Sequence, residues 1–243
     1  MARSRFTPDQ RGRKRHVTLD TQPSSVVGAL AAQGWVFMRC HRPGASSIEA
    51  FSALGEIETV EGLGRVQSLV PKEVSEAHPN TYSGNFGVAE FPLHTDLAHW
   101  AAPPRFVALR CITGVQSVAT RLFDGHVLVE YFGQDLLRAI LVKPRRPMHN
   151  RLQLLQLLQR VRSSDSYLLR WDSVYLQPAS AKSRKLSQEV AAFLASAKFV
   201  EFKLLERGDT LIIDNWRCLH GRDSTPESAG QRRIDRTYLR TVS

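Results

Sequence analysis

The stretch NFGVAEFPLHTDLAHW, residues 85–100, decides how this sequence is interpreted, because it contains the triplet His94-Thr95-Asp96. Strand signals begin at Phe91, and side chains of a strand alternate between its two faces, so we expect His94 and Asp96 to project from the same face. A second histidine, His220, lies far downstream. The triplet alone is weak evidence, since short motifs often occur by chance, and its surroundings must carry the interpretation.

Two imidazoles and one carboxylate on one face of a metal ion leave the opposite coordination positions open. This is the ligand set of the non-haem Fe(II) oxygenases, in which substrates and dioxygen take the open positions. The candidate metal ligands are therefore His94, Asp96 and His220. Cys218 would share a strand face with His220, but we do not expect it to be a ligand, because thiolate is soft and the open set is already complete.

The composition predicts one globular domain. With 243 residues, 42% of them apolar, the chain is long enough to bury one large core. No apolar run approaches the roughly 20 residues that span a bilayer, and the first 16 residues lack the apolar centre of a secretory signal. Three cysteines without a CxxC motif favour a reducing, cytoplasmic environment.

The net charge of +10 has two interpretations. It could mark an anionic partner, such as nucleic acid, an acidic carrier protein or a charged metabolite. It could instead reflect a solubilising surface and a flexible basic leader over residues 1–22. The second interpretation is favoured, because six positive charges gather in the leader with a single aromatic residue, Phe6, among them: Arg3, Arg5, Arg11, Arg13, Lys14 and Arg15.

The sequence predicts helices early and strands late. We expect helices near residues 24–33 and 44–54, a buried strand at 35–38, and a loop over a site at 62–85 with a short strand near 66–70. Strands are expected at 105–112, 120–123, 167–176, 199–204, 210–214 and 237–242. Helices are expected at 127–142 with a break at Gly133, at 152–161 and at 183–197.

This order predicts a mainly β fold with helices, namely a double-stranded β-helix (jelly-roll) core decorated by α-helices. The domain should cover residues 23–243 and contain a helical insertion at about 125–198. No internal repeat is visible in the sequence.

Two further segments strengthen the metal hypothesis, RGDTLIIDNWRCLHGR at 207–222 and RRIDRTYLR at 232–240. Together with residues 85–124, they resemble the Fe(II)/2-oxoglutarate-dependent TauD/TfdA dioxygenases, and the ending is most similar to the clavaminate synthase-like branch. The resemblance extends from about residue 24 to 242. It implies that His94, Asp96 and His220 hold Fe(II), and that the cofactors are Fe(II), 2-oxoglutarate and O2.

The same resemblance implies that a threonine and an arginine bind the far carboxylate of 2-oxoglutarate, which suits the planar fork of a guanidinium. Thr120 matches the threonine, although Ser117-Val118-Ala119 replaces the usual Gly-Gly-Asp before it. Arg236 is assigned to the co-substrate and Arg240 to a substrate anion. The alternative shifts the two roles back to Arg232 and Arg236.

Softer candidates for the substrate pocket come from their position beside the metal motif. Asn85 and His99 flank the metal motif and are assigned to substrate binding, although a histidine beside an aromatic residue is more often structural. Asp96 itself narrows the chemistry, because family members that halogenate lack the carboxylate. An intact carboxylate favours hydroxylation or desaturation.

The sequence therefore predicts a dioxygenase that oxidises a small, carboxylate-bearing metabolite, such as an amino acid that is free or carrier-bound. A membrane is not expected as a partner, nucleic acid is disfavoured, and a homo-oligomer is left open. Two alternatives remain: a jelly-roll binding protein without turnover, and a basic carrier- or nucleic-acid-associated module.

Overall fold

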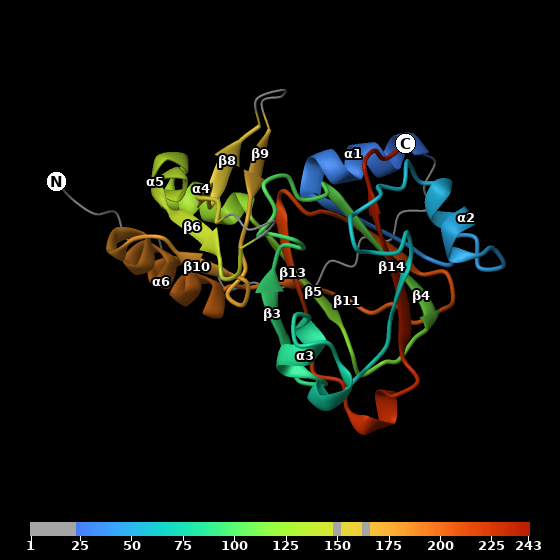
Figure 1. Cartoon of the computed structure of the whole chain (residues 1–243). Helices are drawn as coiled ribbons and strands as arrows, with labels where there is room; N and C mark the ends of the chain where they lie inside the picture. Colours follow the sequence, from blue (N-terminus) through green and yellow to red (C-terminus); the bar gives the residue numbers. More distant parts are fainter. Residues whose placement is uncertain (1–22, 148–151, 162–165) are drawn as a thin grey trace.

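The computed structural model describes residues 23–147, 152–161 and 166–243, and its centre consists of two antiparallel sheets (Figure 1). One sheet has the strand order β1-β12-β4-β14-β2, and the other has the order β11-β5-β13-β3. The strands are β1 Trp35–Met38, β2 Gln67–Leu69, β3 Phe91–His94, β4 Phe106–Thr113, β5 Thr120–Asp124, β11 Val200–Phe202, β12 Thr210–Asp214, β13 Cys218–Arg222 and β14 Arg233–Leu239. The predicted mainly β jelly roll is confirmed. The predicted leader, 1–22, lies outside the described residues.

Alternate residues of each strand serve the two faces of the five-stranded sheet. In β12, Leu211 and Ile213 join a buried cluster with Leu122 and Phe202 of the four-stranded sheet. Ile212 lies between them and joins a different cluster on the opposite face. This period of two makes one face the interior of the jelly roll and the other a surface for helices.

Two helices cover the outer face of the five-stranded sheet. They are α1 (Pro23–Gln33) and α2 (Ser47–Ser52), and Leu30 and Phe51 pack with Ile212. Ser46 caps α2, since its side chain accepts a hydrogen bond from the Glu49 N–H and the Glu49 side chain accepts one from the Ser46 N–H. The two early helices are thus where the sequence predicts them.

A second unit of structure packs beside the sheets, at the left of Figure 1. It has a core of its own, in which Leu128, Leu137, Leu157 and Val190 are buried. Its elements are α4 His126–Phe132, α5 Gln134–Ala139, β6 Leu141–Pro144, β7 Leu155–Gln156, β8 Leu158–Arg160, β9 Tyr167–Leu169, β10 Leu176–Pro178 and α6 Ala181–Ala195. Gly133 separates α4 from α5, as predicted.

The predicted helix at 152–161 is wrong, and the insertion is not purely helical. Within that range the chain forms β7, which pairs with β6, and β8, which pairs with β9. Leu157 between them donates its N–H to Ile140 and accepts the N–H of Arg170. The spacing of the leucines in residues 152–161 fits a helix as well as a strand. The neighbouring strands select the strand by supplying hydrogen-bond partners, which the sequence pattern does not reveal.

The predicted loop at 62–85 contains β2, the short 3-10 helix η1 (Val74–Glu76) and most of α3 (Tyr82–Phe86). A second 3-10 helix, η2 (Glu227–Ala229), precedes β14. Within the described ranges, the helices are all too short or too polar to cross a bilayer.

Candidate metal and substrate site

His94 and His220 are direct neighbours across two strands. His94 is the last residue of β3, and its partner in the ladder with β13 is His220. The centroids of the two rings lie 4.5 Å apart. Paired residues of antiparallel strands point to the same face, so this register unites two histidines that are distant in sequence.

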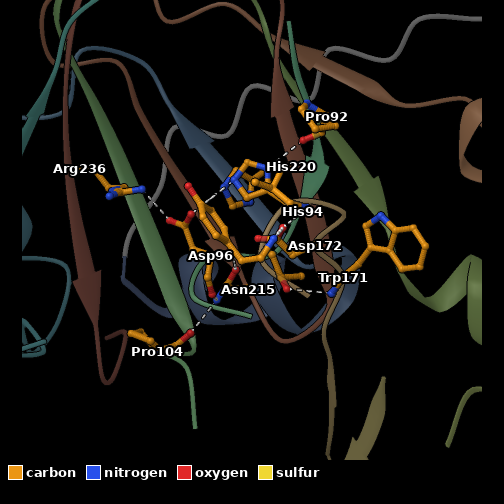
Figure 2. A network of polar contacts seen from close by, with 12 residues as sticks. Pro92, His94, Asp96, Pro104, Trp171, Asp172, Asn215, His220 and Arg236 are labelled. Atoms are coloured by element: carbon orange, nitrogen blue, oxygen red, sulfur yellow. Dashed lines mark hydrogen bonds and ion pairs between the residues drawn. The ribbon is translucent and has the colours of Figure 1, made fainter. Parts of the chain in front are cut away.

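Asp96 joins the two histidines although it lies beyond the strand. Because β3 ends at His94, the prediction that the triplet is one extended strand is wrong. The carboxylate oxygen Oδ1 of Asp96 nevertheless lies 3.5 Å from Nε2 of His94 and 3.7 Å from Nε2 of His220 (Figure 2). All three side chains are buried, and their ligand atoms lie within 4.8 Å of one another.

The donor set has the chemistry of a metal site. Nδ1 of His94 lies 2.8 Å from the carbonyl oxygen of Pro92, so a proton on Nδ1 is bound there and Nε2 is left with its lone pair. Burial, reinforced by His94, lowers the pKa of His220, which favours the neutral imidazole that binds metals. Two imidazoles and one carboxylate fit Fe(II).

The second oxygen of the Asp96 carboxylate is held from the other sheet. Nη1 of Arg236 and the hydroxyl of Tyr238, both on β14, each donate to Oδ2 at 3.0 Å. Burial by itself would raise the pKa of the Asp96 carboxyl, but Arg236 and the contacts with the two histidines hold that pKa well below its usual range. Asp96 is therefore a carboxylate, as a metal ligand must be.

A cavity of about 800 Å³ opens beside these residues, and its deep side lies between the two sheets. Thr120 and Arg222 lie side by side there, because they are ladder partners on the neighbouring strands β5 and β13. Arg232 lines the same side and is 8% exposed. Burial, together with Arg232, lowers the pKa of Arg222 to about 10. The buried guanidinium of Arg232 and the half-buried guanidinium of Arg222 make this side positively charged and suited to an anion.

The outer side of the cavity comes from α3 and from two loops. Tyr82 of α3 stacks on His94, with ring centroids 4.0 Å apart. Asp172 is buried opposite, and its Oδ1 accepts the N–H groups of Val174 and Tyr175, each at 2.7 Å. Burial and the Asp172 carboxylate both raise the pKa of Tyr82, which keeps the phenol protonated. Exposed basic residues also line this side: Lys72, Arg145 and Arg146.

Hydrogen bonds tie the outer loop to the metal motif. The N–H of Thr95 donates to the carbonyl of Trp171, and the N–H of Trp171 donates to Oγ1 of Thr95. Arg170 is fully buried and donates to the carbonyls of Ala98 and Trp100. The segment that bears Asp172 is thus attached on both sides of Asp96.

The structure brings most of the predicted site residues to this cavity. His94, Asp96, His220, Thr120, Arg236, Asn85 and His99 all line it. The amide of Asn85 donates to the backbone of Pro79 and Thr81, so its side chain braces the loop before α3. Burial lowers the pKa of His99 and outweighs the opposing effect of Asp172, so His99 is a neutral group in the wall.

Arg240 does not reach the cavity, contrary to the prediction. Strand β14 ends at Leu239, the Arg240 N–H donates to the carbonyl of Glu56, and the exposed guanidinium pairs with the Glu56 carboxylate at 3.2 Å. Arg232 and Arg236 both line the cavity instead. The geometry thus favours the alternative pair of arginines.

Three residues that shape the site were not assigned a role from the sequence: Asn215, Tyr238 and Asp172. Tyr238 could have been found, since it lies two residues after Arg236 and shares its face on a strand. Asn215 is the last residue of the motif Gly-Asp-x-x-x-x-Asp-Asn (residues 208–215), which lies in the segment 207–222 that strengthens the metal hypothesis. Asp172 carries no local signal, because it lies in an irregular segment between β9 and β10.

Comparison with known proteins agrees with this geometry. The sequence matches, over residues 14–238, the family described as taurine catabolism dioxygenase TauD, TfdA family. Comparison with curated proteins gives no significant match.

Solved structures share the fold at low identity. Asparagine oxygenase, in complex with Fe(II), 2S,3S-3-hydroxyasparagine and succinate, is 19% identical with a TM-score of 0.67, over 89% of this chain and 78% of that one. A taurine dioxygenase from Burkholderia xenovorans is 19% identical with a TM-score of 0.63, over 93% and 83% of the two chains. The non-haem iron oxygenase OrfP, in complex with Fe, succinate and (3S)-hydroxy-L-Arg, is 16% identical with a TM-score of 0.61, over 89% and 77%.

The narrower assignment to the clavaminate synthase-like branch stays a prediction. The match to the family covers both sheets and all three buried donor residues, His94, Asp96 and His220. The chain belongs to the TauD/TfdA family of dioxygenases.

Proposed function

We propose that the chain hydroxylates a small amino acid, with His94, Asp96 and His220 as the ligands of Fe(II). The family is one of dioxygenases, and solved structures that share the fold contain iron with 2-oxoglutarate or succinate. The observation that carries the proposal is the convergence of two imidazoles and a carboxylate at the wall of one large cavity, which has the buried Arg232 on its deep side and a buried carboxylate, Asp172, on its outer side. The bound metal supplies the activation of dioxygen, coupled to the decarboxylation of 2-oxoglutarate.

Thr120 and Arg232 are assigned to the far carboxylate of 2-oxoglutarate. Support comes from the buried charge of Arg232 beside the half-buried charge of Arg222, since an anion between the sheets would neutralise both. The Thr120 side chain is buried on the strand that pairs with β13, next to these arginines. A hydroxyl and a guanidinium together match the oxygens of one carboxylate.

Arg236 and Asp172 are assigned to the two charged groups of the amino acid. Arg236 lies on the cavity wall beside the metal ligands, where it can turn part of its fork to a substrate carboxylate. Asp172 lies across the cavity, and its buried carboxylate suits an ammonium or amide group. Asparagine oxygenase and OrfP, whose complexes contain hydroxylated amino acids, lend support to this substrate class.

The first experiment tests the metal and the co-substrate. Fe(II) and 2-oxoglutarate, added without oxygen, should give a weak visible charge-transfer band. His94→Ala should abolish the band, whereas His126→Ala should retain it, because His126 is exposed on α4, outside the cavity. Wild-type protein without a band would refute the assignment of the ligands.

The second experiment tests the substrate. With oxygen present, a panel of free L-amino acids should contain members that accelerate succinate release and gain one oxygen atom, detected by mass spectrometry. Succinate release that no amino acid stimulates would contradict the proposed substrate class while leaving the metal site intact. Any succinate release that depends on Asp96 would exclude the alternative of a binding protein without turnover.

A further inference from the structure

The backbone of Asp96 lacks a strand partner, and the side chain of Asn215 takes that place. Strand β3 ends at His94, two residues before Asp96. The amide oxygen Oδ1 of Asn215 accepts the Asp96 N–H at 2.7 Å, and Nδ2 donates to the Asp96 carbonyl at 3.0 Å (Figure 2). A carboxamide therefore holds both polar groups of one residue, as a neighbouring strand would.

The Asn215 side chain has no capacity left for a ligand. Its second N–H donates to the carbonyl of Pro104 at 2.9 Å, and the residue is fully buried. The Asn215 backbone is itself fixed, since its N–H donates to the carbonyl of Arg105 at 2.7 Å. The fully bonded amide therefore acts on the site through Asp96 and does not touch a substrate.

The chain needs this support because the residue after Asp96 has a strained backbone. Leu97 has a φ of 53°, a left-handed conformation that is unfavourable for a residue with a side chain. The turn it makes closes with the N–H of Trp100, which donates to the Leu97 carbonyl. Without the Asn215 amide, the Asp96 backbone would be free to relieve the turn, and its carboxylate would move away from the histidines.

We propose that Asn215 is a positioning residue, which fixes the Asp96 carboxylate at the distance from His94 and His220 that metal binding requires. This role rests on the proposed function, since it takes these three residues as the Fe(II) ligands. The role explains why the Gly-Asp-x-x-x-x-Asp-Asn motif ends in an asparagine, although Asn215 is not itself a metal ligand. Partners of this kind typically change metal affinity about 10- to 100-fold when removed.

Two variants remove the amide in different ways. Asn215→Ala leaves a small cavity, and Asn215→Leu fills the space but cannot form the hydrogen bonds. The matched control is Asp209→Ala, at the first aspartate of the same motif. Asp209 is also fully buried and accepts the N–H groups of Cys40, Leu205 and Glu206, at the opposite end of β12 from Asn215. Thermal unfolding and circular dichroism identify the folded variants.

The measurement is the dissociation constant for Fe(II) in anaerobic titrations, repeated with Co(II), whose visible spectrum also reports the ligand geometry. Each folded Asn215 variant should bind both metals about 10- to 100-fold more weakly than the wild type, with an altered Co(II) spectrum. Asp209→Ala should lose stability and keep both the affinity and the spectrum.

Three results separate the hypotheses. Asn215 variants that bind Fe(II) within twofold of the wild type would overturn the positioning role. An equal loss of affinity in Asp209→Ala would also overturn it, because the effect would then result from general destabilisation. A wild-type protein that binds neither metal would instead refute the proposed function.

Discussion

The deep and the outer sides of the cavity are built in different ways. Strands of both sheets form the deep side, where Thr120 and Arg232 lie, and Arg236 lies beside the metal ligands at the junction of the two sides. Short helix α3 and the loops that bear His99 and Asp172 form the outer side. Strand positions are fixed by a ladder of hydrogen bonds, whereas loops vary without disturbing the sheets. The deep side therefore suits the co-substrate that family members share, and the outer side suits the substrate that distinguishes them.

The largest expected effect belongs to the metal ligands, at the junction of the two sides. Asp96→Ala removes the carboxylate that contacts both histidines and leaves Arg236 and Tyr238 without their shared acceptor. We expect complete loss of the anaerobic charge-transfer band and of succinate release. A variant that retained either signal would show that the metal binds elsewhere.

Arg170 joins the two loops of the outer side, and its removal should lower stability strongly. Its guanidinium donates to the carbonyls of Ala98, Trp100 and Ala101 and to Oε1 of Gln159. Arg170→Met keeps the apolar stem but leaves a buried arginine's four acceptors without their donor, at a cost of about 3 kcal/mol in the free energy of unfolding. Urea denaturation of the wild type and the variant measures this loss in the free energy of unfolding. A loss below about 1 kcal/mol would mean that water or a shifted loop replaces the guanidinium.

On the deep side, Arg232→Leu should raise the KM for 2-oxoglutarate about 100-fold, the value of one charged, two-pronged contact. Arg240→Leu is the matched control, because Arg240 is exposed and paired only with Glu56 in the part of the chain described. Its KM for 2-oxoglutarate should stay within twofold of the wild type. An unchanged KM for 2-oxoglutarate in Arg232→Leu would refute the assignment of Arg232 to the co-substrate.

On the outer side, Asp172→Asn should change substrate binding and spare the co-substrate. An asparagine keeps the oxygen that accepts the N–H groups of Val174 and Tyr175, so the loop should be retained while the charge is lost. We expect the KM for the amino acid to rise about tenfold and the KM for 2-oxoglutarate to stay unchanged. A rise in both values would show that the two sides of the cavity are not independent.

Much of the deep side could be predicted from the sequence, because strands have a regular period. His94, Thr120, His220 and Arg236 all lie on strands and line the cavity. The choice between Arg232 and Arg240 could not be predicted, since both are four residues from Arg236. The choice depends on where β14 ends. After Leu239, the Arg240 N–H donates a hydrogen bond to the carbonyl of Glu56, and no local sequence pattern reveals this contact.

The outer side could be predicted only in part, since the sequence predicts Asn85 and His99 near the substrate and both line the cavity, whereas it does not predict Asp172 there. Asp172 lies in an irregular segment whose position depends on contacts with Thr95 and Ala98, far away in the sequence. The leucines of 152–161 fit two periods, and only pairing with β6 and β9 selects the strands. The sequence pattern therefore predicts the strands of the two sheets, while long-range contacts determine the structure of the outer cavity wall.

The ladder pairing of His94 with His220 also makes the metal a reporter of folding. Contacts between residues so distant along the chain close large loops and form slowly. A refolding chain acquires the full donor set only after β3 and β13 have found their register. The appearance of a Co(II) spectrum during refolding would thus measure the time at which the two halves of the chain join, independently of the signals that report helix formation.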